Sequence, residues 1–242
     1  ADAWRTPSLD GVETPIEKAT RVAWDQKMAA EAKKAGREYT PRSAPAKTGK
    51  LSWCWNQVLP QVDKVLVNPG KFYPGYDPEV GYEVAGLVWF QGYRDKDNAA
   101  YGELLAQLIK DFRKKVNTPK MPVVCGTLGM ASFKTEAFSE GANKGMLQTS
   151  QMPDLAGTVD VVNTAPFFPL ELDLLKQVMG AYEKGSPEYE KALMIQKRAI
   201  SNKGFHYHGS AKCFILMGDA MGRSLANLMA GGEPTINATL KK

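Results

Sequence analysis

The two histidines of this chain, His206 and His208, lie two positions apart in a stretch rich in glycine and aromatic residues. Histidine is the side chain that most readily exchanges a proton near neutral pH, so this concentration favours a general base. In an extended loop, side chains at i and i+2 point to opposite sides, so we expect one of the two to face a given site. A zinc pair is the alternative, but no third and fourth ligand stands at suitable spacing.

A second candidate for chemistry follows the apolar run Ala85–Phe90. This run has the composition of a strand that is buried on both faces of a parallel sheet. Ligands bind outside the carboxyl ends of such strands, so we expect the next five residues to line a site. These residues are Gln91, Gly92, Tyr93, Arg94 and Asp95. An ordinary strand-to-helix turn is the alternative interpretation.

Short apolar runs at 85–90, 121–126 and 159–163 alternate with helical patterns, of which 101–116 is the clearest. That alternation predicts a parallel sheet with crossover helices. We therefore expect an α/β fold, a three-layer α/β/α sandwich of the flavodoxin-like kind, whose amino-terminal edge could be incomplete. The glycine-rich loop 126–130 follows the second run, and it would be either a wall of the same cleft or a tight turn.

The chain divides into an irregular amino-terminal segment and one α/β domain. Residues 1–50 are rich in Pro, Lys, Ala and Thr, with one expected helix from Ile16 to about Ala35. The α/β domain is expected over 51–232, and 233–242 would be a tail. Within it, 168–201 reads as a helical insertion of two helices, and nothing on these helices suggests chemistry.

The composition is that of an ordinary globule of 242 residues with a net charge of +5. Its Lys and Arg residues are scattered and not interleaved with aromatic residues, which argues against nucleic acid as a partner. Cys54, Cys125 and Cys213 are spaced too irregularly for a disulfide framework or a zinc motif, and the last two read as small core residues. No stretch approaches the roughly 20 apolar residues that span a bilayer.

The segment Val-Trp-Phe-Gln-Gly-Tyr-Arg-Asp at 88–95 resembles the Trp-x-Gln-Gly-x-x-Asp block of one esterase group. This group is the sialate O-acetylesterase-like, carbohydrate esterase family six branch of the SGNH hydrolases. The segment His-Tyr-x-Gly-Ser-Ala at 206–211, followed by a helical pattern, resembles the last block of the same family. The resemblance implies an SGNH fold and a hydrolase that removes acetyl esters from sugars. It implies no metal, nucleotide or flavin.

The resemblance also implies roles for individual residues. His206 would be the base that activates a serine and later protonates the leaving alcohol, with His208 as the second candidate or a ligand contact. Gln91 and Gly92 would lie where the family stabilises the oxyanion. Tyr207, by contrast, is expected to pack in the core.

The chain departs from the family pattern in two places. The Gly-Gln-Ser or Gly-Asp-Ser block that carries the nucleophile near the amino terminus is absent, so an upstream segment or a partner chain would supply the serine. The superfamily places an aspartate three residues before the histidine, where this chain has Lys203, so Asp95 is the candidate for the orienting acid.

Two alternatives to an esterase follow from these departures. One is a relative that binds a carbohydrate or a protein without hydrolysing it, and the other is a structural subunit of an assembly. The chain opens Ala-Asp-Ala without an initiator Met, so a secretory signal could have been removed. We therefore expect a periplasmic or secreted protein.

Overall fold

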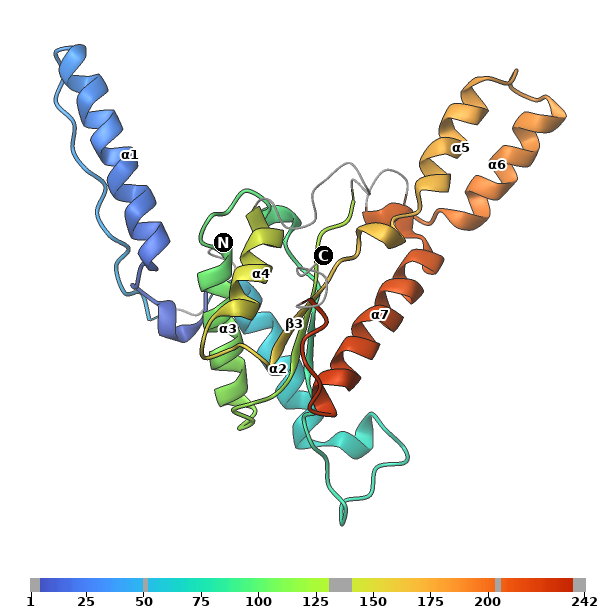
Figure 1. The fold of residues 1–242 in the computed structure, drawn as a ribbon, viewed down its shortest axis with the longest axis horizontal. Coiled ribbons are helices and arrows are strands. Elements are labelled where there is room, and N and C mark those ends of the chain that lie inside the picture. Colours follow the sequence, from blue (N-terminus) through green and yellow to red (C-terminus); the bar gives the residue numbers. More distant parts are fainter. Residues whose placement is uncertain (1–4, 50–51, 131–140, 203–205, 237–242) are drawn as a thin grey trace. The chain divides into compact units, whose positions relative to one another are not determined.

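The computed structural model describes residues 5–49, 52–130, 141–202 and 206–236 (Figure 1). The described residues form seven α-helices and one three-stranded sheet, together with short 3-10 turns. The predicted α/β class is confirmed, and this content is consistent with the expected three-layer α/β/α fold.

The chain folds as two compact units, each assembled from three separated segments. Unit 1 comprises Ala1–Ala85, Arg94–Met121 and Glu140–Leu155. Unit 2 comprises Gly86–Tyr93, Pro122–Ser139 and Ala156–Lys242. The expected boundaries at residues 50, 168, 201 and 232 stay predictions.

The sheet lies in unit 2, and its strands are parallel in the order β1-β2-β3. Leu87 pairs with Val123, which in turn pairs with Val159, so the three strands begin at one level and end at one edge. This is the parallel arrangement that the alternating apolar runs predict. The strands are β1 (Leu87–Trp89), β2 (Val123–Gly126) and β3 (Val159–Val162).

Burial differs sharply between the strands. Val123, Val124 and Cys125 of the central strand β2 are all 0% exposed. In β1, however, Val88 is 45% exposed, so the expectation of a strand buried on both faces is wrong for β1. The reason is position, because β1 is an edge strand and the covering helix α7 (Ala211–Met229) packs mainly on β2 and β3.

Helix α7 provides the apolar face that covers the sheet. Its buried side chains recur every three or four residues, as expected for a helix with one face in the core. The helix begins where the side chain of Ser210 accepts a hydrogen bond from the Cys213 amide. The core cluster that it forms with the sheet contains Val124, Tyr207, Cys213, Met217, Met221 and Leu228.

A buried carboxylate, Asp160, interrupts the apolar run of β3 with 0% exposure. Its Oδ2 accepts hydrogen bonds from the hydroxyls of Ser224 (2.6 Å) and Thr235 (2.7 Å) and from the Thr235 amide (2.9 Å). Its Oδ1 accepts from the amides of Val161 (2.8 Å) and Ile236 (3.0 Å). These bonds compensate the desolvation of the charge and join β3, α7 and the 235–236 segment.

The predicted helical insertion is a pair of helices, α5 (Leu170–Gly180) and α6 (Pro187–Ala199), which pack on each other. Ser186 caps α6 by accepting the Tyr189 amide at 3.2 Å, and Pro187 occupies the first helical position.

Unit 1 is helical, with α3 and α4 packed against each other. Helix α3 carries the predicted apolar stripe, in which Leu104, Leu105, Leu108 and Ile109 are buried. The helices of this unit are α1 (Pro15–Lys34), α2 (Trp53–Val67), α3 (Tyr101–Lys115) and α4 (Gly141–Gln151).

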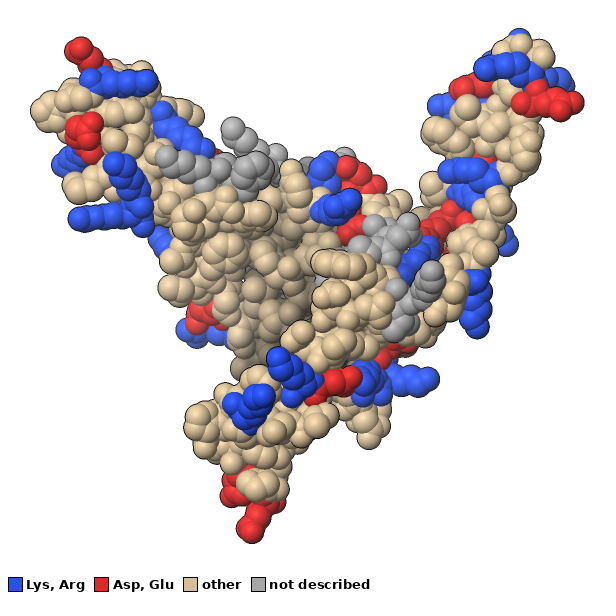
Figure 2. All heavy atoms as spheres, turned by 180° about the vertical axis from the view of Figure 1, so that it is seen from behind, with Lys and Arg blue, Asp and Glu red and all other residues tan. Residues whose placement is uncertain are grey.

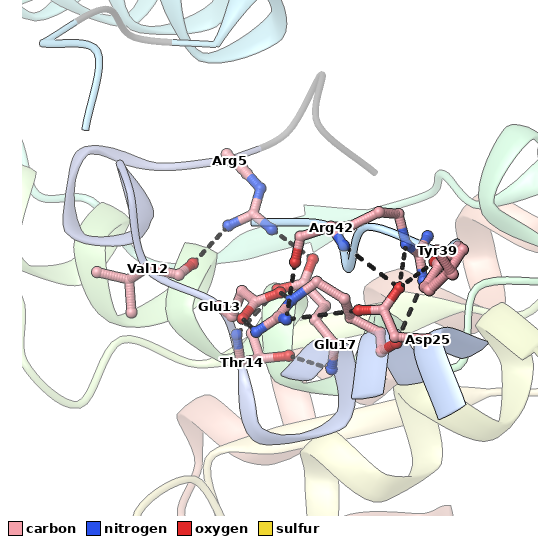
Figure 3. A network of polar contacts seen from close by, with 9 residues as sticks. Arg5, Val12, Glu13, Thr14, Glu17, Asp25, Tyr39 and Arg42 are labelled. Atoms are coloured by element: carbon pink, nitrogen blue, oxygen red, sulfur yellow. Dashed lines mark hydrogen bonds and ion pairs between the residues drawn. The ribbon is translucent and has the colours of Figure 1, made fainter. Parts of the chain in front are cut away.

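The expected helix in the first 50 residues is α1, which begins at a capping box between Thr14 and Glu17. Polar contacts tie the flanking segments to it (Figure 3). Arg21 donates to both carboxylate oxygens of Glu13, at 2.7 and 2.8 Å. Asp25 accepts the Tyr39 hydroxyl at 2.7 Å, and this bond is the largest cause of its lowered pKa. The segment after the helix is therefore anchored although it is irregular.

Figure 2 shows Lys and Arg side chains together with Asp and Glu side chains on the outer segments of this view, whereas its centre is mostly uncharged. No helix among the described residues has the length and apolar character needed to cross a membrane.

We predict that Asp160→Asn lowers the free energy of unfolding by about 3 kcal/mol, because in either orientation the new amide NH₂ would face at least one backbone N–H, which can only donate. Urea denaturation measures the change. Asp219→Asn, which removes an exposed ion pair with Arg223 on α7, is the control and should change stability little. Equal effects of the two substitutions would contradict the role given to Asp160.

We also predict that the three cysteine thiols resist alkylation in the folded chain. All three are free and buried, and burial raises the pKa of Cys125 to about 12 and that of Cys213 to about 11. A raised pKa lowers the fraction of reactive thiolate, so little modification is expected at about pH 8. Mass spectrometry after iodoacetamide treatment tests this, with the denatured chain as the fully reactive control. Rapid labelling of any thiol in the folded chain would overturn the expectation.

Candidate active site

The loops that follow β2 and β3 are joined at the carboxyl edge of the sheet. The Thr164 amide donates to Thr127 Oγ1 at 3.0 Å, and the Thr164 hydroxyl donates to the Thr127 carbonyl oxygen at 2.5 Å. Both threonines are 0% exposed. The glycine-rich loop at 126–130 is therefore fixed to its neighbour at the edge where parallel sheets bind ligands.

The stretch with both histidines forms a tight left-handed turn. His206, Tyr207 and His208 have φ values of 46°, 55° and 58°, and Gly209 follows at 61°. A left-handed conformation costs roughly 1–2 kcal/mol for each residue that carries a Cβ. Glycine suits position 209, because a Cβ there would lie 2.9 Å from the backbone nitrogen of Asn202. The expectation of an extended loop at the two histidines is thus wrong. Because the left-handed turn is strained, surrounding contacts must hold it in place.

Tyr207 supplies the main anchor of this turn. Its hydroxyl oxygen accepts the Gly129 amide at 2.8 Å, which ties the turn to the loop after β2. Its ring is 5% exposed and packs near the rings of Phe90, Phe168 and Phe214, with centroids 5.8–6.0 Å apart. Burial is the largest influence on its pKa, which is raised. The expectation that Tyr207 packs in the core is confirmed. The hydrogen bond of its hydroxyl to the Gly129 amide was not expected from the sequence.

Gly129 makes this contact because it has no side chain. A Cβ at this position would lie 2.5 Å from the Ala165 amide nitrogen, so any larger residue would push the two loops apart.

His208 is buried, with 6% exposure, and its Nε2 lies 2.9 Å from Asp173 Oδ1 on α5. The ring of Phe168 packs near it, with a centroid distance of 5.9 Å. Its Nδ1 is buried and has no hydrogen-bond partner within the described ranges. Asp173 is thus a carboxylate in contact with a candidate base, although the sequence offered no reason to look for chemistry on this helix.

His206 is exposed, in contrast to His208. Its Nδ1 lies 2.8 Å from the side-chain amide nitrogen of Asn202. The two rings therefore face different surroundings, although the turn is left-handed and not the extended loop from which this was expected. Lys203, which occupies the position of the family's acid, lies outside the described residues.

The predicted residues at 91–95 fall into both units. Gln91, Gly92 and Tyr93 follow β1 in unit 2, and Tyr93 is 64% exposed. The rings of Phe90 and Tyr207 contact each other. Phe90 directly precedes Gln91, and Tyr207 directly follows His206. The structure therefore brings the two sequence blocks to the same sheet edge.

Arg94 and Asp95 belong to unit 1, where Asp95 is 5% exposed. The pairing of Asp95 with His206 therefore stays a prediction. Over the described ranges, no three His, Cys, Asp or Glu side chains gather as metal ligands would.

We predict that Tyr207→Phe destabilises the fold by about 1–3 kcal/mol, because the buried Gly129 amide loses its partner while the ring is kept. Urea denaturation measures the loss. Tyr182→Phe removes the same hydroxyl at a position that is 43% exposed, and it should stay within about 0.5 kcal/mol of the original chain. If both variants behave alike, the Tyr207 hydroxyl is not an anchor.

Comparison with protein families shows a match to the family described as "Carbohydrate esterase, sialic acid-specific acetylesterase". It covers residues 74–166, which is less than half of the 242-residue chain. The match includes all three strands and Gln91–Asp95, and it ends before the two histidines. Comparisons with curated proteins and with solved structures found no match.

This match supports an esterase-like function in general terms, and it confirms the resemblance seen at 88–95. Residues 74–166 of this chain are thus similar to the sialic acid-specific acetylesterases of the carbohydrate esterases.

Proposed function

We propose that this protein is a carbohydrate O-acetylesterase that removes acetyl groups from sugars by a serine–histidine mechanism. One observation carries the proposal: Tyr207 holds the histidine turn against Phe90, at the strand end that leads into Gln91 and Gly92. That strand end lies within the segment that matches the esterase family.

In this mechanism His206 is the base. It accepts the proton of a serine hydroxyl while the serine oxygen attacks the acetyl carbonyl carbon. The carbonyl oxygen becomes an oxyanion, which accepts hydrogen bonds from the Gln91 side chain and the Gly92 amide. Such donors are typically worth about 2.7–4 kcal/mol in the transition state. His206 then passes its proton to the departing sugar oxygen, and water releases acetate from the acyl serine in a second round.

Exposure supports His206 over His208 as this base. A base must come within hydrogen-bond reach of the serine hydroxyl beside a bulky sugar ester. His206 is exposed, whereas His208 is 6% exposed and its Nε2 already contacts Asp173. The His208–Asp173 pair remains the second candidate, because a carboxylate beside an imidazole is the usual orienting contact.

The serine itself is proposed to come from an upstream segment or a partner chain. Asp95 is proposed to orient the base, and Tyr93 and Arg94 to contact the acetylated carbohydrate. An exposed tyrosine ring such as that of Tyr93 suits stacking on a sugar face. A periplasmic or secreted location belongs to the same proposal.

A non-catalytic relative that binds a carbohydrate or a protein is the second candidate function, and a structural subunit is a third. The observation in favour of both is the missing Gly-Gln-Ser or Gly-Asp-Ser block. An intact gene that encodes such a block upstream would favour the esterase.

We predict that acetate release from acetylated xylan, acetylated sialic acid or an aryl acetate is abolished by His206→Ala. His208→Ala is the matched control. It removes the contact with Asp173 that helps to hold the turn, so it should reduce acetate release but not abolish it. The assay uses the product of the intact gene and this chain side by side, with circular dichroism to confirm folding. The reverse ranking of the two variants would make His208 the base. No acetate release from either protein would exclude the esterase and leave the binding and structural alternatives.

A further inference from the structure

The segment 69–83, which follows α2 in unit 1, carries several aromatic side chains outside any core (Figure 1). Its regular structure is limited to a short 3-10 turn at Pro69–Lys71. Phe72, Tyr73 and Tyr82 are 45%, 65% and 53% exposed. Large aromatic side chains contribute most to stability when they are buried, so three exposed rings in one short segment indicate an interaction surface.

Hydrogen bonds within the segment fix the backbone that carries these rings. The amides of Phe72 and Tyr73 both donate to the Pro69 carbonyl oxygen at 2.9 Å. The Tyr76 amide donates to the Tyr73 carbonyl oxygen at 3.0 Å, which closes a second turn. The ring of Tyr76 packs against Gly70, where a Cβ would lie 3.4 Å from its Cδ1 atom. A preformed backbone lowers the entropy cost of binding, so these turns favour recognition of a ligand.

Carboxylates accompany the aromatic rings. The carbonyl oxygen of Asp77 accepts the Gly81 amide at 3.0 Å, and its Oδ1 accepts the Glu79 amide at 2.9 Å. The side chains of Asp77, Glu79 and Glu83 are exposed. Lys71 is the one basic residue of the segment, so the segment is negatively charged although the whole chain is positive.

Flat aromatic faces beside exposed carboxylates suit the chemistry of a sugar ring. One face of a sugar ring presents C–H groups that pack on an aromatic face, and its hydroxyls donate hydrogen bonds to carboxylates. The negative charge of the segment disfavours an acidic polymer, because like charges repel. A neutral polysaccharide therefore fits the segment best.

We propose that the segment 69–83 binds a neutral polysaccharide and that Tyr73 and Tyr82 stack on its sugar rings. The choice of ligand rests on the proposed carbohydrate function, whereas these residues are separate from those assigned to acetyl transfer. Phe72 supports the segment, because Lys64 of α2 lies 5.9 Å from its ring centroid and covers one face. The polymer is thus held by contacts that do not depend on its acetyl groups.

Native electrophoresis in gels that contain a soluble polysaccharide tests the proposal, because binding retards the protein. The neutral probes are xylan freed of its acetyl groups, mannan and β-glucan, and polysialic acid is the acidic comparison. At least one neutral probe should retard the original chain. Tyr73→Ala and Tyr82→Ala should each weaken binding about tenfold, as expected for the loss of one aromatic contact. Tyr73→Phe keeps the ring and should retain binding.

Two further variants serve as controls, with circular dichroism to confirm folding. Tyr182→Ala removes an exposed ring outside the segment and should leave binding unchanged. Val80 lies within the segment and is 83% exposed. A protein partner would bury this aliphatic side chain, whereas a sugar stacks on rings, so Val80→Ser should also leave binding unchanged.

Three results would overturn the proposal. These are no retardation by any neutral probe, stronger retardation by polysialic acid, and a loss in Val80→Ser as large as that in Tyr73→Ala, which would indicate a surface for a protein. Because the neutral probes carry no acetyl ester, these results do not depend on acetate release. Binding without acetate release from the intact gene product would instead remove the proposed esterase and keep the polysaccharide site.

Discussion

The hydrogen bond from the Gly129 amide to the Tyr207 hydroxyl is the contact on which the candidate site depends. Three consecutive residues with side chains, including both histidines, adopt left-handed backbone angles that are costly in isolation. Burial of the tyrosine ring and this one polar bond offset that cost and fix the turn at the carboxyl edge of the sheet. Strain held in place by a buried anchor is a recurrent feature of functional sites.

The anchor also explains why two neighbouring histidines have different surroundings. Tyr207 stands between them and points into the core, so the turn directs His206 outward and leaves His208 buried beside Asp173. The buried histidine links the turn to α5 and adds to its rigidity. The exposed histidine is left accessible for proton transfer, which is the division of roles that the proposed mechanism uses.

Buried polar groups join the elements of unit 2 as much as apolar packing does. Asp160 accepts five hydrogen bonds and joins β3 to α7 and to the 235–236 segment. Thr127 and Thr164 link the loops that follow β2 and β3. Such networks specify one arrangement because each unsatisfied buried group would cost about 1–3 kcal/mol. The hydrogen bonds between Thr127 and Thr164 therefore fix the two loops to each other at the sheet edge that carries the candidate site.

The sequence by itself determined the α/β class, the positions of the strands and main helices and the resemblance to esterases at 88–95, because periodicity and short motifs are local properties. It could not show that β1 is an edge strand with Val88 exposed, since strand order depends on contacts between distant segments. Nor could it pair His208 with Asp173, which lies 35 residues away on a different helix. The tertiary structure alone decided the left-handed turn and the different surroundings of its histidines, because packing of Tyr207 outweighs the local backbone preference.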